Sequence, residues 1–206
     1  LFIQGNFENV NFEFNRKFNF QKDKINEIRY DKNLLTGCVN FFDTNFKNII
    51  LKSSDMICED SINIKNSSGI INKIQIDNSY FDALDLDFSK IKINDLKVNN
   101  AKNDCIDFSF GEYEIINANL KNCGDKGLSV GERSKLNMHN GVIMYSNIGI
   151  ASKDDAITNV KNVAMNNMNI CLAAYNKKKE FKGSKLNIKS LNCSQYNTLK
   201  QLDRLS

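Results

Sequence analysis

The stretch FDALDLDFSK, residues 81–90, is followed 22 residues later by the similar stretch NDCIDFSFGE, residues 103–112. Each contains a six-residue unit in which a small residue, an aliphatic residue and an aspartate follow one another. Related units recur at the same step without a gap from residue 60 to residue 175, as DSINIK, DALDLD, DCIDFS, KGLSVG, IGIASK and ICLAAY. One step earlier, GCVNFF at residues 37–42 fits with a shift of one residue. A fixed period of this length is the sequence signature of a solenoid.

The alternation within each unit predicts a strand with one buried side. The third residue is always Ile or Leu, and the second is always small. Because alternate side chains of a strand face opposite ways, the third and fifth positions should point inward and the fourth and sixth outward. Each period holds two further short apolar stretches, separated by turns rich in Asn and Gly. Three strands per period, without helical periodicity, predict an all-β fold: a right-handed parallel β-helix with coils of about 22 residues.

The repeat also suggests how the chain is divided. We expect an irregular first coil or cap over residues 1–36, the β-helix over residues 37–193, and a C-terminal cap or tail over residues 194–206. A solenoid needs its open ends covered, because an exposed strand edge invites pairing with another chain. The last segment, SQYNTLKQLDRLS, is expected to be a short amphipathic capping helix.

Composition excludes some functions. The chain has 206 residues, is 41% hydrophobic and carries a formal net charge of +4. This charge is too small to predict nucleic-acid binding, and no basic patch interleaved with aromatic residues supports it. No apolar run is long enough to span a membrane, and no signal-peptide pattern occurs. Since the chain begins at Leu1, we expect a trimmed N-terminus and allow for further domains in a longer chain.

The outward positions carry the candidate site. Adjacent rungs of a parallel sheet lie ~4.8 Å apart, so Asp85 and Asp107 should be stacked neighbours, with Asp87 on the same side. Like charges at this distance repel, so either a pKa rises or a cation or hydrogen-bond donor is bound. The same two columns contribute candidate substrate-binding residues: Asn63, Lys65, Ser109, Ser129, Lys153 and Tyr175.

Three interpretations of these carboxylates stay open. In the first, they accept hydrogen bonds from turn amides and lie in water, with Lys126 as counterion; this suits the second acidic column, Asp60, Asp82 and Asp104. In the second, Asp85, Asp87 and Asp107 are the catalytic acid and base of glycoside hydrolysis. In the third, the same three residues hold Ca²⁺, which prefers several oxygen ligands.

The third interpretation would need a base for lyase or epimerase chemistry, and Lys153 and Tyr175 are of the right type. Lys153 lies three rungs from Asp87, about 14 Å, which suits separate sugar subsites better than one catalytic centre. The basic segment over residues 176–183 is expected to be a solvated loop.

The six cysteines are interpreted as small buried residues with free thiols. Cys105 and Cys171 fall in the small second column, and Cys123 and Cys193 fall in equivalent turns. No CxxC motif occurs, and with the single His139 a zinc site is not expected.

A resemblance adds to this interpretation. The segments DALDLDFS, DCIDFSFGEYEI, CGDKGLSVGERSKL, NIGIASKDDA and AAYNKKKEF, in this order, resemble bacterial right-handed β-helix repeat domains. Such domains are often attached to secreted CotH-kinase-like or lamin-tail-bearing proteins. The resemblance covers most of residues 36–190. The broader superfamily is similar to pectate lyases, polygalacturonases and mannuronan epimerases, although the His and Arg/Lys signature of the polygalacturonases is not found here.

The resemblance implies an extracellular or cell-envelope location and a polysaccharide or oligosaccharide as partner, but no settled activity. If the chain is an enzyme, it implies a polysaccharide lyase, an epimerase or a glycoside hydrolase. We therefore expect a carbohydrate-associated β-helix module that binds or processes an extracellular or envelope polysaccharide. The alternative is a non-enzymatic structural or adhesive surface module without a small ligand.

Overall fold

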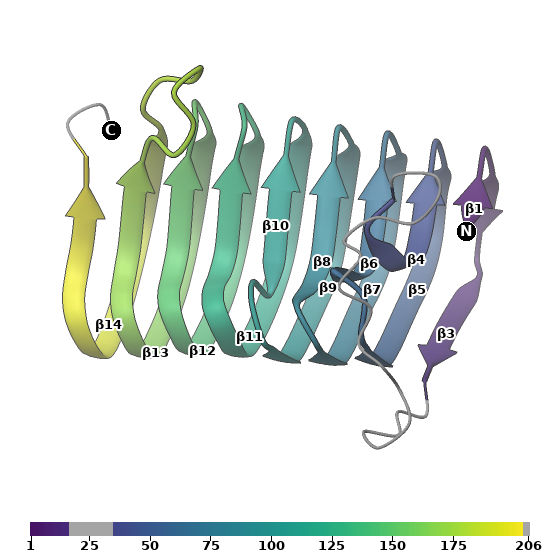
Figure 1. Ribbon diagram of the computed structural model, residues 1–206, viewed down its shortest axis with the longest axis horizontal. Coiled ribbons are helices and arrows are strands. Elements are labelled where there is room, and N and C mark those ends of the chain that lie inside the picture. The colour runs from purple at the N-terminus through teal and green to yellow at the C-terminus, as the bar shows by residue number, and fades with distance from the viewer. Residues whose placement is uncertain (17–34, 204–206) are drawn as a thin grey trace.

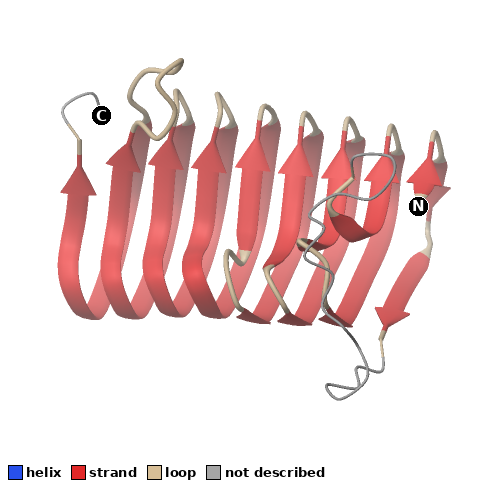
Figure 2. Cartoon of the chain, in the orientation of Figure 1, coloured by secondary structure: helices blue, strands red, loops and turns tan. Residues whose placement is uncertain are grey.

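The computed structural model describes residues 1–16 and 35–203, and every regular element among them is a strand (Figures 1 and 2). The strands stack side by side in parallel along one long axis (Figure 1). They are β1 (Phe2–Ile3), β2 (Asn6–Glu8), β3 (Asn11–Asn15), β4 (Gly37–Phe42), β5 (Asn45–Met56), β6 (Asp60–Lys65), β7 (Ser68–Ser79), β8 (Asp82–Asp87), β9 (Lys90–Ala101), β10 (Ile106–Ser109), β11 (Glu112–Gly131), β12 (Lys135–Lys153), β13 (Ile157–Tyr175) and β14 (Lys185–Leu202).

The repeat units form one face of the solenoid, which we call the first face. It consists of β4, β6, β8 and β10, followed by the last residues of β11, β12, β13 and β14. The predicted register is confirmed, since consecutive third-position residues are partners: Ile62, Leu84, Ile106, Leu128, Ile150 and Leu172. The shift of one residue in the first unit is confirmed as well, because Gly37 pairs with Asp60 and Val39 with Ile62.

The long strands complete each coil. The first part of β11 pairs with β9 and its last part pairs with β10, so one continuous strand contributes to more than one face. In β12 and β13 the same arrangement repeats with their neighbours. The prediction of an all-β parallel β-helix is therefore confirmed.

The core is the stack of inward columns. Leu84, Ile106, Leu128 and Ile150 have no exposed surface, and the fifth-position residue Phe108 is equally buried. No single coil could bury these side chains alone, so stacking of neighbouring coils supplies the hydrophobic stabilisation.

The cysteines are paired, which corrects the expectation of free thiols. Disulfides join Cys38 to Cys58, Cys105 to Cys123 and Cys171 to Cys193, and no cysteine is free. Disulfides persist in oxidising environments such as the extracellular space.

The pairing has a geometric reason. The small second position of a rung lies next to the end of the last strand of the same coil, at the corner where the coil closes, and the Cα atoms of Cys105 and Cys123 are 5.3 Å apart. Ser61 and Ser79 occupy the corresponding positions two rungs earlier, and their Oγ atoms hydrogen-bond at 2.7 Å. They are 18 residues apart, as are Cys105 and Cys123. In a coil of about 22 residues, a separation of 18 residues brings the chain back to the same corner, and this spacing could have indicated the Cys105–Cys123 disulfide from the sequence.

The capping helix expected over residues 194–206 is wrong. β14 continues as a strand to Leu202, where Thr198 pairs with Ile170 and Lys200 with Leu172. The edge of β13 offers unpaired backbone groups, and pairing with them satisfies the hydrogen bonds of this segment.

At the N-terminus, Phe2 of β1 pairs with Phe41, and the ring centroids of the two residues are 4.7 Å apart. The remainder of the expected N-terminal cap, residues 17–34, lies outside the described residues. Over residues 1–16 and 35–203, no helix is long and apolar enough to cross a membrane.

Candidate functional site

Five aspartates gather on the outer side of the first face, and we call this surface the carboxylate face. Its members are Asp82, Asp85, Asp87, Asp104 and Asp107. The stacking expected from the sequence is confirmed, because Asp85 pairs with Asp107 and Asn63 pairs with Asp85.

Asp85 and Asp87 share one hydrogen-bond donor, the side-chain amide of Asn63. Asn63 donates from Nδ2 to Asp85 Oδ2 at 2.8 Å and to Asp87 Oδ2 at 3.4 Å. Burial, with the charges of Asp60, Asp87 and Asp107, raises the pKa of Asp85 well above its ordinary value. Burial also raises the pKa of Asp87, against the opposing effect of Lys65, and Asp87 hydrogen-bonds Asp85. Protonation of one of the two carboxyls would relieve the repulsion between them.

Asp82 and Asp104 occupy the turn that leads into each strand. Asp82 Oδ1 accepts hydrogen bonds from Asn103 Nδ2 and from the Asp104 backbone N–H, both at 2.7 Å. Asp104 Oδ1 accepts from the Lys126 backbone N–H at 3.0 Å and from Lys126 Nζ at 3.3 Å. The predicted turn hydrogen bonds and the predicted counterion are therefore confirmed.

The expectation that this column lies in water is wrong for Asp60 and Asp104, because both side chains are buried. Asp60 is only 2% exposed and Asp104 only 4% exposed. Burial and the neighbouring Asp104 raise the pKa of Asp82 to about 7. Burial outweighs Lys126 and raises the pKa of Asp104 to about 6.

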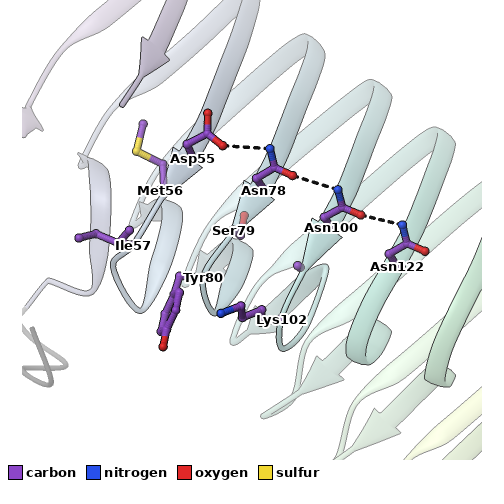
Figure 3. Close-up of a pocket in the computed structure, with 10 residues that line it drawn as sticks. Asp55, Met56, Ile57, Asn78, Ser79, Tyr80, Asn100, Lys102 and Asn122 are labelled. Carbon is purple, nitrogen blue, oxygen red and sulfur yellow. Dashed lines mark hydrogen bonds between the residues drawn. The ribbon is translucent and has the colours of Figure 1, made fainter. Parts of the chain in front are cut away.

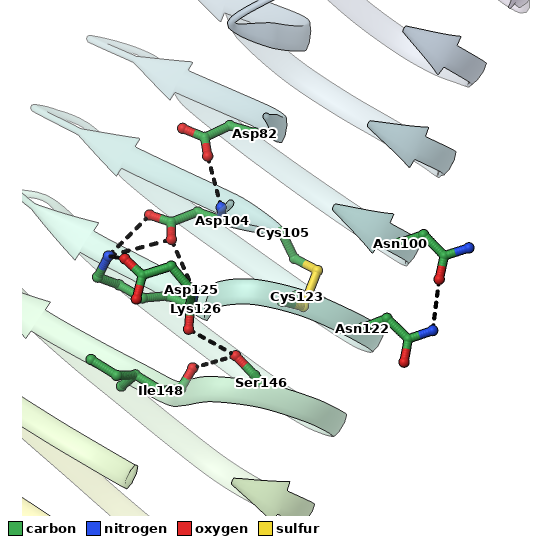
Figure 4. Close-up of a disulfide and its surroundings, with 10 residues drawn as sticks. All are labelled: Asp82, Asn100, Asp104, Cys105, Asn122, Cys123, Asp125, Lys126, Ser146 and Ile148. Atoms are coloured by element: carbon green, nitrogen blue, oxygen red, sulfur yellow. Dashed lines mark hydrogen bonds and ion pairs between the residues drawn. A yellow bond between two sulfur atoms is a disulfide. The ribbon is translucent and has the colours of Figure 1, made fainter. Parts of the chain in front are cut away.

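An ion pair and a disulfide hold this corner together (Figure 4). Lys126 pairs with both Asp104 and Asp125. The pKa of Lys126 is raised, because Asp104 and Asp125 outweigh the opposing effect of burial. Cys105 follows Asp104 directly, and its disulfide to Cys123 ties the two chain segments that supply the pair.

The two acidic columns meet in one cluster. Oxygen atoms of Asp82, Asp104 and Asp107 all lie within 4.8 Å of one another. The trio that converges is therefore not the predicted set of Asp85, Asp87 and Asp107. Carboxylate oxygens suit Ca²⁺, but an ion here would compete with Lys126 for Asp104 and with backbone donors for Asp82.

Lys153 reaches this cluster from two rungs away. Its Nζ lies 3.6 Å from Asp107 Oδ1, which corrects the expectation of a separate, distant subsite. The stem of Lys153 crosses Gly131, where an added Cβ would meet Lys153 Cε at 2.9 Å. The pKa of Lys153 is raised, because Asp107 and Glu132 outweigh the opposing effect of burial.

The remaining residues predicted to bind substrate differ in their exposure to solvent. Asn63, Ser129 and Lys153 are almost fully buried, at 1%, 0% and 3% exposure. Ser129 pairs with Asp107 in the sheet, and its Oγ has no hydrogen-bond partner. Tyr175 pairs with Lys153 and is half-buried.

The segment over residues 176–183 is a largely exposed loop, as expected, and hydrogen bonds tie its backbone to the body of the solenoid. Asp154 Oδ1 accepts from the Lys177 and Lys178 backbone N–H groups at 2.7 and 2.8 Å. Lys178 forms an ion pair with Glu132, and Glu132 also accepts a hydrogen bond from Ser109 Oγ at 2.7 Å. Burial opposes ionisation of Glu132, but these two hydrogen bonds lower its pKa.

Two exposed aromatic residues border the carboxylate face and were missed in the sequence. Phe88 and Phe110 stack with ring centroids 4.7 Å apart and are 52% and 38% exposed. Both have φ near 49°, a conformation that bulky residues rarely adopt. Asn66 occupies the same turn position one rung earlier, so the change from Asn to Phe was the available signal.

No protein-family model matches the chain, and the comparisons with curated proteins and with solved structures give no match.

His139 lies off the first face, as expected from its register, and its Nε2 lies 3.1 Å from Glu114 Oε1. The chain is therefore an all-strand parallel β-helix whose first face carries a cluster of carboxyl groups with raised pKa values.

Proposed function

We propose that this β-helix binds an extracellular or cell-envelope polysaccharide on its carboxylate face. The resemblance to the pectate-lyase-like superfamily and to β-helix domains of secreted bacterial proteins supports this class of partner. One observation carries the proposal: carboxyl groups with raised pKa values lie beside ion-paired carboxylates on adjacent rungs. Such a surface can both donate to and accept from the hydroxyl groups of successive sugar units.

The charges favour a neutral or amino-sugar polymer over a polyuronate. The cations nearest the cluster, Lys126 and Lys153, are buried and paired with aspartates. They are therefore poorly placed to bind the carboxylates of a uronic-acid chain. Asp85, Asp87 and Asp107 would instead repel such a chain and attract an ammonium group.

One observation favours glycoside hydrolysis as a second candidate function. Hydrolysis needs a protonated carboxyl beside an ionised one, and retaining enzymes hold the two groups about 5 Å apart. Asp82, with its pKa raised to about 7, would be the proton donor. Asp107, which faces the Lys153 ammonium and lies within 4.8 Å of Asp82, would be its partner.

The experiment is a glycan-array and affinity comparison of the parent chain with Asp85→Asn and Asp107→Asn, with and without Ca²⁺. We expect the parent to bind at least one neutral or amino-sugar glycan and both variants to lose most of this affinity. Asp95→Asn is the matched control, because Asp95 lies in β9, away from the carboxylate face, and accepts a hydrogen bond from Asn117.

Calcium is tested in the same samples. If the cluster holds Ca²⁺, the ion should raise the melting temperature of the parent but not that of Asp107→Asn. Unchanged glycan affinity in both variants, together with no effect of Ca²⁺ on melting, would favour the structural or adhesive module instead.

A further inference from the structure

A concave surface lies at the ends of the long strands β5, β7 and β9, and we call it the Tyr80 groove (Figure 3). Its volume is about 470 Å³. Met56 and Ala101, which are 7% and 3% exposed, contribute an apolar floor. The groove is separate from the carboxylate face, since it is lined by Asp55, Met56, Ile57, Asn78, Ser79, Tyr80, Asn100, Ala101, Lys102 and Asn122.

One wall of the groove is a ladder of side-chain amides. Asn78 Nδ2 donates to Asp55 Oδ1 at 2.9 Å, Asn100 donates to Asn78 at 2.9 Å, and Asn122 donates to Asn100 at 2.6 Å. All four residues have φ between 57° and 64°, a backbone conformation that Asn and Asp tolerate well.

The ladder leaves hydrogen-bonding capacity toward solvent. A carboxamide has two N–H donors and two acceptor lone pairs, and contact with one neighbour on each side uses one of each. Asn78, Asn100 and Asn122 are exposed. Each can therefore offer one donor and one acceptor to a ligand, repeated at the rung spacing of ~4.8 Å.

The other wall is an aromatic ring held in place. Lys102 Nζ lies 3.9 Å from the centroid of the Tyr80 ring, and Phe81 packs against Tyr80 with centroids 4.8 Å apart. Figure 3 shows the ring between Ile57 on one side and Lys102 on the other. The ammonium covers one ring face, so only the opposite face could receive a ligand.

We infer that the Tyr80 groove is a second glycan subsite, which binds a linear, uncharged polysaccharide lying parallel to the solenoid axis. The apolar C–H face of a pyranose would stack on Tyr80, and its hydroxyl groups would pair with the amide ladder. Successive pyranoses of a β-1,4-linked chain are flipped, so groups on one side of the chain repeat every two sugar units, which is about two rungs of the ladder. An extended peptide repeats same-side groups at roughly 6.6 Å, which matches neither one rung nor two.

The charge of the groove fits an uncharged partner. Among the described residues that line it, Asp55 and Lys102 are the only ionisable side chains apart from Tyr80, and their charges are opposite. The identity of the ligand rests on the proposed function, but the residues are different, so the two proposals can fail separately.

The experiment is calorimetric titration of the full chain with two neutral hexasaccharides, cellohexaose and chitohexaose. We expect two binding events per parent chain. Tyr80→Ala should weaken one of them at least tenfold and leave the other unchanged, whereas Asp107→Asn should remove the other. Tyr196→Ala is the matched control, because Tyr196 is 43% exposed and lies on the last coil, outside the groove.

Lys102→Met tests the orientation of the ring, since it keeps a long apolar side chain without the ammonium. We expect a smaller loss of affinity than in Tyr80→Ala. Binding that is lost in Asp107→Asn but unchanged in Tyr80→Ala overturns the groove and leaves the carboxylate face standing. Binding that is lost in Tyr80→Ala but unchanged in Asp107→Asn overturns the carboxylate face as a glycan site and supports the groove. A parent chain that binds neither hexasaccharide overturns both proposals.

Discussion

Lys153 Nζ lies 3.6 Å from Asp107 Oδ1, although the end of β11 lies between β10, which carries Asp107, and β12, which carries Lys153. The contact is made over Gly131, which has no side chain to block the lysine stem. Lys153 is 3% exposed, so this charge depends on its carboxylate partners for compensation.

We therefore expect Lys153→Met to destabilise the protein by about 2 kcal/mol, because it leaves Asp107 without its counter-charge. Chemical unfolding measures the change. Adding Asp107→Asn to Lys153→Met should recover about 1 kcal/mol, since the double variant has no unpaired charge. Strictly additive losses would show that the two residues do not interact.

Gly131→Ala tests the path of the stem. The added Cβ would lie 2.9 Å from Lys153 Cε, so the lysine must move away from Asp107. We expect a loss of stability of about 1 kcal/mol in the parent. In the Lys153→Met background the loss should be smaller, because the flexible methionine can leave this position. Equal losses in both backgrounds would contradict the proposed path.

The stability of the protein should depend on Asp82. Its pKa is about 7 in the folded protein and 3.8 ordinarily, so the folded state binds a proton that the unfolded state releases. The stabilisation that the protonated Asp82 carboxyl contributes is fully present below about pH 4 and is lost as the pH rises toward 7. The melting temperature of Asp82→Asn should therefore fall less between pH 4 and pH 7 than that of the parent. Calorimetric melting across this range measures the difference, and equal falls in parent and variant would show that the Asp82 carboxyl has an ordinary pKa.

The Cys105–Cys123 disulfide should contribute about 3 kcal/mol, because it restricts an 18-residue separation in the unfolded chain. Replacing both cysteines with Ala copies the neighbouring coil, in which Ala83 and Ala101 occupy the corresponding positions. The variant should fold with reduced stability in denaturant. Alkylation of denatured but unreduced protein followed by mass spectrometry should find no free thiol, and six modified cysteines would disprove the pairing.

Leu128→Asp should abolish cooperative folding, since Leu128 is fully buried in the inward column and an unpaired carboxylate there costs several kcal/mol. Circular dichroism during heating provides the measurement, with Leu128→Met as the control that conserves volume. A soluble Leu128→Asp protein with a normal melting transition would be incompatible with this core.

The 22-residue period by itself determined the architecture, the register and the buried columns. The reason is that a parallel ladder repeats its environment at every rung, so an inward position must be apolar in each coil. Ile106 opposite Leu128 and Asp85 opposite Asp107 both follow from counting along the chain. The partnership of Lys126 with Asp104 follows in the same way, because the two are one rung apart.

Tertiary structure alone decided the contacts that run across coils or through the interior. The reach of Lys153 depends on the open space over Gly131, and the gathering of Asp82 with Asp107 depends on how the turn bends into the strand. The Cys105–Cys123 disulfide depends on two positions that meet at the corner where a coil closes, and the last segment became a strand because the edge of β13 was open to pair with it. Periodicity places residues along the axis, whereas these contacts depend on side-chain length and on the path of the backbone around each coil.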